Sequence, residues 1–173
     1  MKKLVCIILV LSCSIIFWGC SEPPSESDGV FTYTLLENGT YRISAKSTTS
    51  VKGNVVIPDE YNGIPVTFIS AYGFRDCDEI TSVSMGKNIT YVDIAAFFRC
   101  DSLITVNLPN SLKSIHYKGF VGQCPMLTGI TFEGTSSEFS KLVKGHFDTW
   151  INTSTLVHCT ADDTYIRLYD KNA

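Results

Sequence analysis

The sequence lacks several features that would identify a function directly. It has no excess of basic side chains, because 14 Lys and Arg residues stand against 17 Asp and Glu residues and the formal net charge is -3. A surface that binds nucleic acid is usually basic, so this balance argues against a nucleic-acid partner. The apolar content of 45% is ample for a packed core, which argues against ordinary disorder.

Motifs that bind nucleotides or carry catalysis are also absent. The chain contains no GxGxxG, P-loop, HExxH, GxSxG or CxxC pattern, and its three histidines share no metal-ligand spacing. We therefore expect no catalytic residue, no metal ion and no cofactor. Two alternatives stay open, because His158 beside Cys159 offers a pair of metal ligands and acidic pairs could hold a cation. The acidic pairs are Asp76 with Asp78, which the repeat places in a solvated loop, and Asp162 with Asp163.

One long apolar run is present, and it lies at the N-terminus. The string MKKLVCIILVLSCSIIFWGC has a basic start, an apolar stretch and a small residue before Cys20, which is typical of an export signal. It resembles a bacterial lipoprotein signal, which implies cleavage after Gly19 and a lipid on Cys20. Cys13, in VLSC, is the alternative anchor. We expect a signal at residues 1–19, a flexible, solvated tether at 20–29, and an exported protein held on a membrane at the cell surface or the periplasmic face.

Residues 30–63 are predicted to form an N-terminal β cap and a half-repeat. Apolar residues alternate with polar ones in VFTYTLL and again in TYRISA, on either side of Asn38-Gly39, and this is a hairpin signal. Both turn residues tolerate the positive φ that a tight turn demands. The hairpin is well placed to cover the open end of the structure that follows, and NVVIPDEYNG supplies a first, incomplete repeat.

Residues 64–133 contain three related segments of about 23 residues, and the third of them gains one residue. A fixed period of this length indicates one supersecondary unit per repeat, stacked on its neighbours as a solenoid. Seven apolar columns persist through the three segments. They are Val66, Ile89 and Leu112; Ile69, Val92 and Ile115; Phe74, Phe97 and Phe120; Cys77, Cys100 and Cys124; Ile80, Leu103 and Leu127; Val83, Val106 and Ile130; and Met85, Leu108 and Phe132.

Each coil is predicted to contain two extended runs. ITSVSM, LITVNL and LTGITF form one set of strands, and VTFIS, ITYVD and LKSIH form the second, shorter set. Between them we expect a short helical turn, because Phe74 and Cys77 have the i,i+3 spacing that points both side chains inward. Residues 134–173 then form a C-terminal cap and tail. The fold class is a β-rich α/β solenoid with three full coils and a cap at each end.

From residue 31 to residue 163 the chain resembles the BspA-like leucine-rich repeats of bacterial surface proteins. The resemblance rests on GNVVIPDEYNGIPVTFIS, on the F..C..L..V.LP coils and on the segment from ITFEGT through Trp150 to VHCTADD. It departs at Gly86, where the family usually has Pro, and at Gly122-Gln123, which lengthen the third coil. The resemblance implies a leucine-rich-repeat binding or adhesion module with a host matrix protein, a microbial surface protein or a glycan as partner. It supplies no shared catalytic or ligand residues.

The cysteines of the repeats admit two interpretations. An exported chain with seven cysteines commonly has disulfides. Side chains in one column of a solenoid run parallel, however, so we expect a ladder of buried thiols at Cys77, Cys100 and Cys124, with Cys159 as a free thiol in the C-terminal cap. A single bridge or a metal-thiolate site stays open as the alternative.

A binding surface is less clearly indicated than the fold. The outward strand positions are small, hydroxylic and almost uncharged, which suits water or a shallow contact with a protein or glycan. Aromatic and Arg side chains, which dominate binding hot spots, gather instead on the turn between the strands, at Tyr72, Arg75, Phe98 and Arg99. We expect these four residues to contact a partner. The alternative is a structural or accessory envelope protein without a separate ligand.

Overall fold

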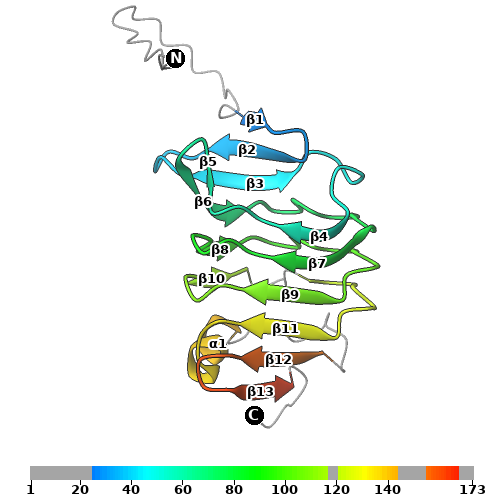
Figure 1. Cartoon of the computed structure of the whole chain (residues 1–173), viewed down its shortest axis with the longest axis vertical. Helices are drawn as coiled ribbons and strands as arrows, with labels where there is room; N and C mark the ends of the chain where they lie inside the picture. The colour runs from blue at the N-terminus through cyan, green and yellow to red at the C-terminus, as the bar shows by residue number, and fades with distance from the viewer. Residues whose placement is uncertain (1–24, 117–120, 144–154, 168–173) are drawn as a thin grey trace, which may run out of the picture.

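The computed structural model describes residues 25–116, 121–143 and 155–167. The chain winds into an elongated stack of coils, with the N-terminal hairpin at one end and the C-terminal strands at the other (Figure 1). Each regular coil adds one short strand to each of two sheets, and the side chains between the sheets form the core. The predicted solenoid is confirmed.

The first sheet, sheet A, begins with the hairpin and continues through the coils in the order β1-β2-β3-β6-β8-β10, with β5 paired to β6. The hairpin strands are antiparallel, whereas β3, β6, β8 and β10 are parallel. Parallel pairing follows because every coil enters the sheet in the same direction. The strands are β1 (Ser25–Ser27), β2 (Phe31–Leu35), β3 (Tyr41–Ala45), β5 (Glu60–Tyr61), β6 (Ile64–Ile69), β8 (Tyr91–Val92) and β10 (Ser114–Ile115).

The second sheet, sheet B, has six strands in the order β13-β12-β11-β9-β7-β4. All are parallel except β13, which turns back against β12. Val83 pairs with Val106 and Val106 with Ile130, so the register follows the sequence repeat. The strands are β4 (Gly53–Val56), β7 (Ile80–Ser84), β9 (Thr105–Leu108), β11 (Gly129–Phe132), β12 (Leu156–Cys159) and β13 (Thr164–Arg167).

The arcs between the two sheets differ from the helical turns predicted for them. Phe74 and Cys77 are both buried, as expected, but the arc is a chain of single turns with Tyr72 and Asp76 at positive φ. A residue in the left-handed region interrupts any helix. Backbone hydrogen bonds run between neighbouring arcs instead, for example from the Phe74 N–H to the Ala96 carbonyl at 2.8 Å. Neighbouring coils are thus joined by backbone hydrogen bonds in the arcs as well as in the two sheets.

The predicted interior columns are confirmed wherever the structure describes them. Every column member is buried, while Phe120 lies outside the described residues. The rings of Phe74 and Phe97 stack with centroids 4.9 Å apart, and Phe31 of the hairpin packs edge-on against Phe74 at 6.1 Å. The hairpin therefore continues the aromatic stack of the coils and closes the N-terminal end.

Gly86 explains one departure from the family pattern. A Cβ atom at this position would lie 2.8 Å from the Pro58 carbonyl oxygen and 2.9 Å from the Asp59 amide nitrogen. Both distances are too short for a side chain, so the chain passes this point with no room for one. The Asp59 carboxylate accepts a hydrogen bond from the Lys87 N–H at 2.7 Å and holds the two coils together there.

The repeat cysteines form the predicted buried column of free thiols. The Cys100 thiol donates to the Phe74 carbonyl at 3.1 Å, and the Cys124 thiol donates to the Phe97 carbonyl at 3.1 Å. Each thiol thus bonds to the preceding coil. Burial, with the nearby Asp78 and Asp76 carboxylates, raises the pKa of Cys77 to about 11, so this thiol stays protonated at neutral pH. Cys159 is also free and buried.

The last part of the predicted tether differs from expectation. Residues 20–24 lie outside the described residues, but Ser25–Ser27 form the exposed strand β1, which pairs antiparallel with β2. The physical reason is local hydrogen bonding at Asp28, whose carboxylate accepts from the Phe31 N–H at 2.7 Å and from the Tyr33 hydroxyl at 2.8 Å. These bonds fix the approach of the chain to the hairpin.

The C-terminal end contains more repeat structure than the sequence predicts. Strand β12 pairs in register with β11 and adds one further rung to sheet B, and β13 covers it. Helix α1 (Ser136–Val143) lies near β10, the last strand of sheet A. Its Phe139 is buried and packs on Phe132 with centroids 5.6 Å apart. Trp150, which we place in the closing segment, lies outside the described residues.

Within these described ranges, no helix is both long and apolar enough to cross a membrane.

Candidate functional site

The four residues predicted to contact a partner come together on the arcs. Tyr72 and Arg75 lie on the arc between β6 and β7, and Phe98 and Arg99 lie on the arc between β8 and β9, one coil further along. Asp76 lies among them. We call these five residues the arginine patch. Because a repeat of about 23 residues stacks equivalent arcs directly on one another, residues of two coils meet at a single place.

The backbone beneath the arginine patch is held in an uncommon conformation. Tyr72, Asp76 and Arg99 have φ values of 55°, 56° and 57°, in the left-handed region that L-residues with side chains seldom occupy. Hydrogen bonds between arcs compensate for this strain. The Tyr72 N–H donates to the Ile94 carbonyl at 3.0 Å, and the Asp76 N–H donates to the Phe98 carbonyl at 2.9 Å. The backbone that carries the arginine patch is therefore held in place by hydrogen bonds between neighbouring arcs.

The side chains of the arginine patch interlock around Arg75. Its guanidinium carbon lies 5.7 Å from the Tyr72 ring centroid and 5.7 Å from the Phe98 ring centroid, within cation–π range of both. Its Nε lies 3.1 Å from one Asp76 carboxylate oxygen. The other Asp76 oxygen lies 3.4 Å from the Nε of Arg99. One carboxylate thus bridges the two guanidinium groups.

The arginine patch is accessible despite this network. Tyr72 is 50% exposed, and the side chains of Arg75 and Arg99 are 45% and 54% exposed. Their contacts are therefore partly screened by water, and their contribution to folding is small. Aromatic and Arg side chains that are rigid yet exposed are the usual anchors of binding surfaces. The geometry suits recognition more than stabilisation.

Asp76 is the member of the patch that sequence reasoning missed. We expected it to form a solvated pair with Asp78, and Asp78 is indeed exposed, but Asp76 is half-buried and turned toward the arginines. A signal was available, because Asp76 and Arg99 are 23 residues apart and so occupy one column of the repeat. Opposite charges one coil apart in a column can pair.

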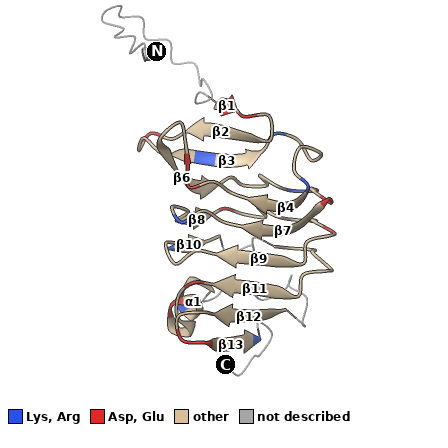
Figure 2. Ribbon diagram, in the orientation of Figure 1, with Lys and Arg blue, Asp and Glu red and all other residues tan. Residues whose placement is uncertain are grey.

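The outward face of sheet B is the second surface considered from sequence. Its central strands β7, β9 and β11 carry no charged residue (Figure 2). Some of its polar groups bond to one another, since the Ser82 hydroxyl donates to the Asn54 side-chain oxygen at 2.8 Å and the Asn107 amide donates to the Ser84 hydroxyl at 3.2 Å. These bonds reduce the number of groups that face solvent without a partner.

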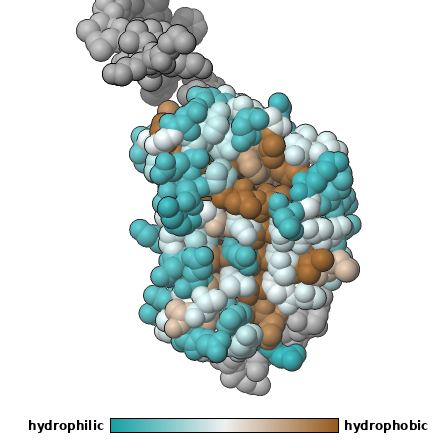
Figure 3. Space-filling view, viewed as in Figure 1, coloured by the Kyte–Doolittle hydropathy of each residue, from teal (hydrophilic) through white to brown (hydrophobic). Residues whose placement is uncertain are grey.

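Exposed hydrophobic side chains form a narrow band and not a compact patch. In the space-filling view they gather in a narrow band along the long axis, with polar residues on both sides (Figure 3). The large hydrophobic residues with substantial exposure come from different coils. Among the described residues they are Val30, Val56, Tyr72, Ile104, Met126 and Tyr165.

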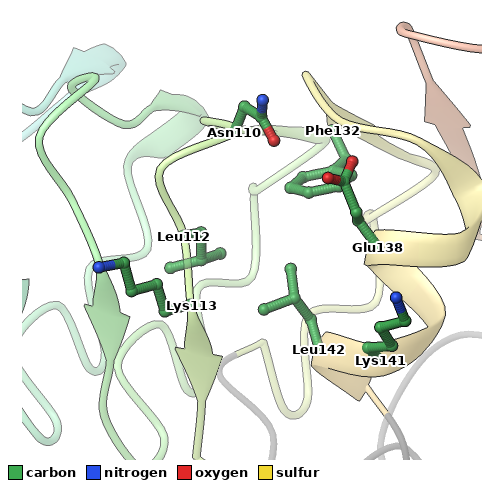
Figure 4. A pocket seen from close by; sticks show the side chains of 7 residues that line it. All are labelled: Asn110, Leu112, Lys113, Phe132, Glu138, Lys141 and Leu142. Atoms are coloured by element: carbon green, nitrogen blue, oxygen red, sulfur yellow. The ribbon is translucent and has the colours of Figure 1, made fainter.

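A cavity of about 290 Å³ lies between α1 and the segment 110–113 that precedes β10 (Figure 4). Leu112, Phe132 and Leu142 give it an apolar lining, and Glu138 is occupied in capping the helix, because its carboxylate accepts from the Thr135 N–H at 2.9 Å. The Lys113 and Lys141 ammonium groups lie on opposite sides of it in this view. Its charged groups do not converge on one point, as a site for a small polar ligand requires.

The His158 and Cys159 pair considered as metal ligands is split by strand geometry. Cys159 is buried in the core, whereas His158 faces outward and its Nε2 lies 2.9 Å from an Asp163 carboxylate oxygen. Its ring also stacks on Tyr165, with centroids 4.3 Å apart and an interplanar angle of 4°. Successive side chains of a strand point to opposite faces, so these two cannot ligate one ion.

Comparison with known proteins gives one family match. The model of the BspA type leucine rich repeat region matches residues 54–160, in six copies. The match begins at β4 and ends beyond β12, so it includes both the half-repeat and the additional C-terminal rung. No match to a curated protein sequence is found.

Three solved bacterial leucine-rich repeat proteins are similar in fold. A protein from Bacteroides capillosus is 19% identical with a TM-score of 0.45, over 64% of this chain and 99% of its own. The T. pallidum leucine-rich repeat protein is 18% identical with a TM-score of 0.37, over 62% and 71%. A leucine-rich cell surface protein from Faecalibacterium prausnitzii is 16% identical with a TM-score of 0.38, over 72% and 44%.

Proposed function

Since the chain belongs to the BspA-type leucine-rich repeat family, we propose that it is a recognition or adhesion module of the cell envelope. It binds a protein or glycan partner through the arginine patch, and it has no catalytic role. Host matrix proteins and the surface molecules of other microbes are the partner classes that the family suggests.

The arrangement around Arg75 is the observation that carries this proposal. Two aromatic rings and one carboxylate hold its guanidinium on an exposed surface, although such contacts contribute little to folding. Anchors that are ordered before binding lose less entropy when a partner arrives, and they bind more tightly for that reason. Stacked coils present such anchors side by side, which multiplies modest contacts.

We further propose that the module is held on a membrane by a lipid at Cys20. The support is the sequence pattern at residues 1–20, which lies outside the described part of the chain. In cells fed a fatty-acid analogue, the full-length protein should take up the label, and Cys20→Ala should lose it. Label that persists in Cys20→Ala and disappears in Cys13→Ala would move the anchor to the alternative position.

The binding proposal is tested with the full-length protein in detergent, screened against matrix proteins and glycans. The double variant Phe98→Ala, Arg99→Ala should weaken binding to any partner by about tenfold or more, as expected for hot-spot residues, with a nearly unchanged melting temperature. Lys113→Ala, on an exposed site away from the patch, is the control. Unaltered affinity in the double variant would reject the arginine patch and direct attention to the face of sheet B.

One observation favours a second candidate, a structural or accessory envelope component without a separate ligand. The outward polar groups of sheet B that bond to each other, such as Ser82 with Asn54, suit a spacer whose surface is already satisfied. A spacer should tolerate the double variant in cell-adhesion assays but lose function when coils are deleted or added. A binding module should show the opposite pattern.

A further inference from the structure

Resting on the proposed function, we infer the chemistry of the partner: the arginine patch binds a carboxylate side chain of an acidic protein segment. The terminal nitrogens of Arg75 and Arg99 donate hydrogen bonds to the carboxylate, and the Tyr72 and Phe98 rings contact the neighbouring apolar residues of that segment.

Arg75 presents its free donors in one direction. The Tyr72 and Phe98 rings both lie within cation–π distance of its guanidinium, and its Nε donates a hydrogen bond to the Asp76 carboxylate at 3.1 Å. Within the described residues no protein group bonds to its two terminal nitrogens. The terminal edge of this guanidinium is therefore open, and its two parallel N–H donors match the two oxygens of a carboxylate.

Arg99 adds a second exposed guanidinium group beside the first. Its Nε also faces Asp76, at 3.4 Å, and its side chain is 54% exposed. The Asp76 carboxylate thus accepts a hydrogen bond from Arg75 through one oxygen and makes only an ion-pair contact with Arg99 through the other. Among the described residues, no protein group bonds to the terminal nitrogens of either arginine, so these nitrogens are open to a ligand. Two arginines beside one aspartate leave a local excess of one positive charge, which one carboxylate neutralises.

Exposed acidic residues surround the arginine patch. Asp78 and Glu79 follow directly on the same arc, Asp101 lies on the next, and all three are exposed. Glu79 pairs with Lys52 at 3.0 Å, so these two charges offset each other and the repulsion comes from Asp78 and Asp101. A densely sulfated or phosphorylated polymer would place several anions near these acids and be repelled by them. An isolated carboxylate between apolar residues avoids that repulsion, which favours a protein segment over a polyanionic glycan.

The experiment selects ligands with the full-length protein as bait. A library of random dodecapeptides is panned, the best peptide is synthesised together with its counterpart in which every acid becomes the amide, and heparin and polygalacturonate are used as competitors. We expect enrichment of Asp and Glu in the selected peptides. The amide counterpart should bind about tenfold or more weakly, because a hydrogen bond between charged groups is lost.

Protein variants then place the carboxylate. Arg75→Gln with Arg99→Gln should abolish the preference for the acidic peptide over its amide, and Arg75→Lys should reduce it, because Lys keeps the charge but not the paired donors. Lys52→Gln, which removes one positive charge nearby, is the control and should leave the preference intact. Equal melting temperatures exclude misfolding as the cause.

Several results would overturn the inference. They are the absence of any enriched peptide, enrichment without acids, a preference that survives in the double Gln variant, or displacement of the peptide by heparin or polygalacturonate at lower concentrations than by free peptide. Selected peptides that bind at the patch without needing a carboxylate would reject the inference alone. Binding of native partners that ignores Phe98→Ala, Arg99→Ala would reject the proposed function itself.

Discussion

The N-terminal end of the solenoid is closed by an antiparallel hairpin that extends sheet A, whereas the C-terminal end is closed by β12 and β13, which extend sheet B, and by α1 near the last strand of sheet A. The two ends also differ in the forces that hold them. Tyr33 of the hairpin is 1% exposed and stacks on Tyr61 with centroids 3.8 Å apart. At the other end, Thr135 and Asp162 hold α1 through hydrogen bonds at exposed sites.

The end of a solenoid can thus be covered in either of two ways. The hairpin continues the column of stacked rings, so it is fixed mainly by the burial of apolar surface, which involves no titrating group. Helix α1 buries Phe139 but depends at its first turn on capping groups that titrate. The coils that lie between the two ends support both the hairpin and α1.

The largest effect is expected from a change in that shared support. Phe97 is fully buried and stacks on Phe74, so Phe97→Ala should lower the free energy of unfolding by about 3 to 5 kcal/mol. That is a large share of the total for a small domain, and both ends should lose protection from hydrogen exchange together. Thermal melting followed by circular dichroism measures the loss.

The neighbouring residue is the control for this experiment. Phe98 is half-buried and belongs to the arginine patch, so Phe98→Ala should lower the melting temperature far less than Phe97→Ala does. A Phe97→Ala protein that melts within a degree or two of the parent would show that the interior columns are assigned wrongly.

A smaller effect is expected at the N-terminal end. Tyr33→Ala removes a buried ring that contacts Phe31, Tyr41 and Tyr61, and it should cost about 3 kcal/mol. Tyr33→Phe keeps the ring but loses the hydrogen bond to the Asp28 carboxylate, which should cost about 1.5 kcal/mol. Urea unfolding of the two variants separates packing from hydrogen bonding.

The hairpin should respond before the rest of the molecule. We expect Tyr33→Ala to expose the amides of β2 and β3 to hydrogen exchange while α1 keeps its protection. Equal loss of protection at both ends would contradict the view that each end is sealed independently.

Much of the fold could be predicted from the sequence, because every coil of a stack needs apolar residues at the same positions. The columns of Val83 and Phe97 are apolar at a fixed spacing, and that spacing alone assigns strands and interior. The hairpin also follows from local alternation around Asn38-Gly39. Both features depend on residues close in sequence or related by the period.

Other features could not be predicted, because they depend on contacts that the period does not encode. Strand β1 forms through the bonds of Asp28, within a segment whose composition is that of a tether. The rung at β12 follows a coil without the repeat's Phe and Cys, so its pattern is hidden. At the candidate site, residue type predicted four of the five residues, and the 23-residue spacing of Asp76 and Arg99 was a further signal. The contact of Asp76 with both arginines follows only from the geometry of two arcs.

The smallest effect is expected at the C-terminal end, and it should appear only in acid. Hydrogen bonds from the Ser136 hydroxyl and N–H lower the pKa of Asp162 below its ordinary 3.8, and the Thr135 N–H and hydroxyl lower the pKa of Glu138 below 4.5. A carboxyl group whose pKa is lower in the folded state stabilises the fold above its unfolded pKa and loses that effect as the pH falls through its folded pKa.

The melting temperature should therefore stay level between pH 7 and 5 and fall once the pH drops below about 4.5. Asp28 titrates in the same direction at the N-terminal end. Although partial burial alone would raise its pKa, the bonds from Phe31, Tyr33 and Val30 keep it low. The hairpin still has its buried rings when Asp28 is protonated, whereas the first turn of α1 then has no charged cap. Hydrogen exchange at pH 3, corrected for intrinsic rates, should consequently show α1 opening before β2 and β3, and Asp162→Asn with Glu138→Gln should flatten the acid dependence. Hairpin amides that open first would assign the acid-sensitive contact to Asp28 instead.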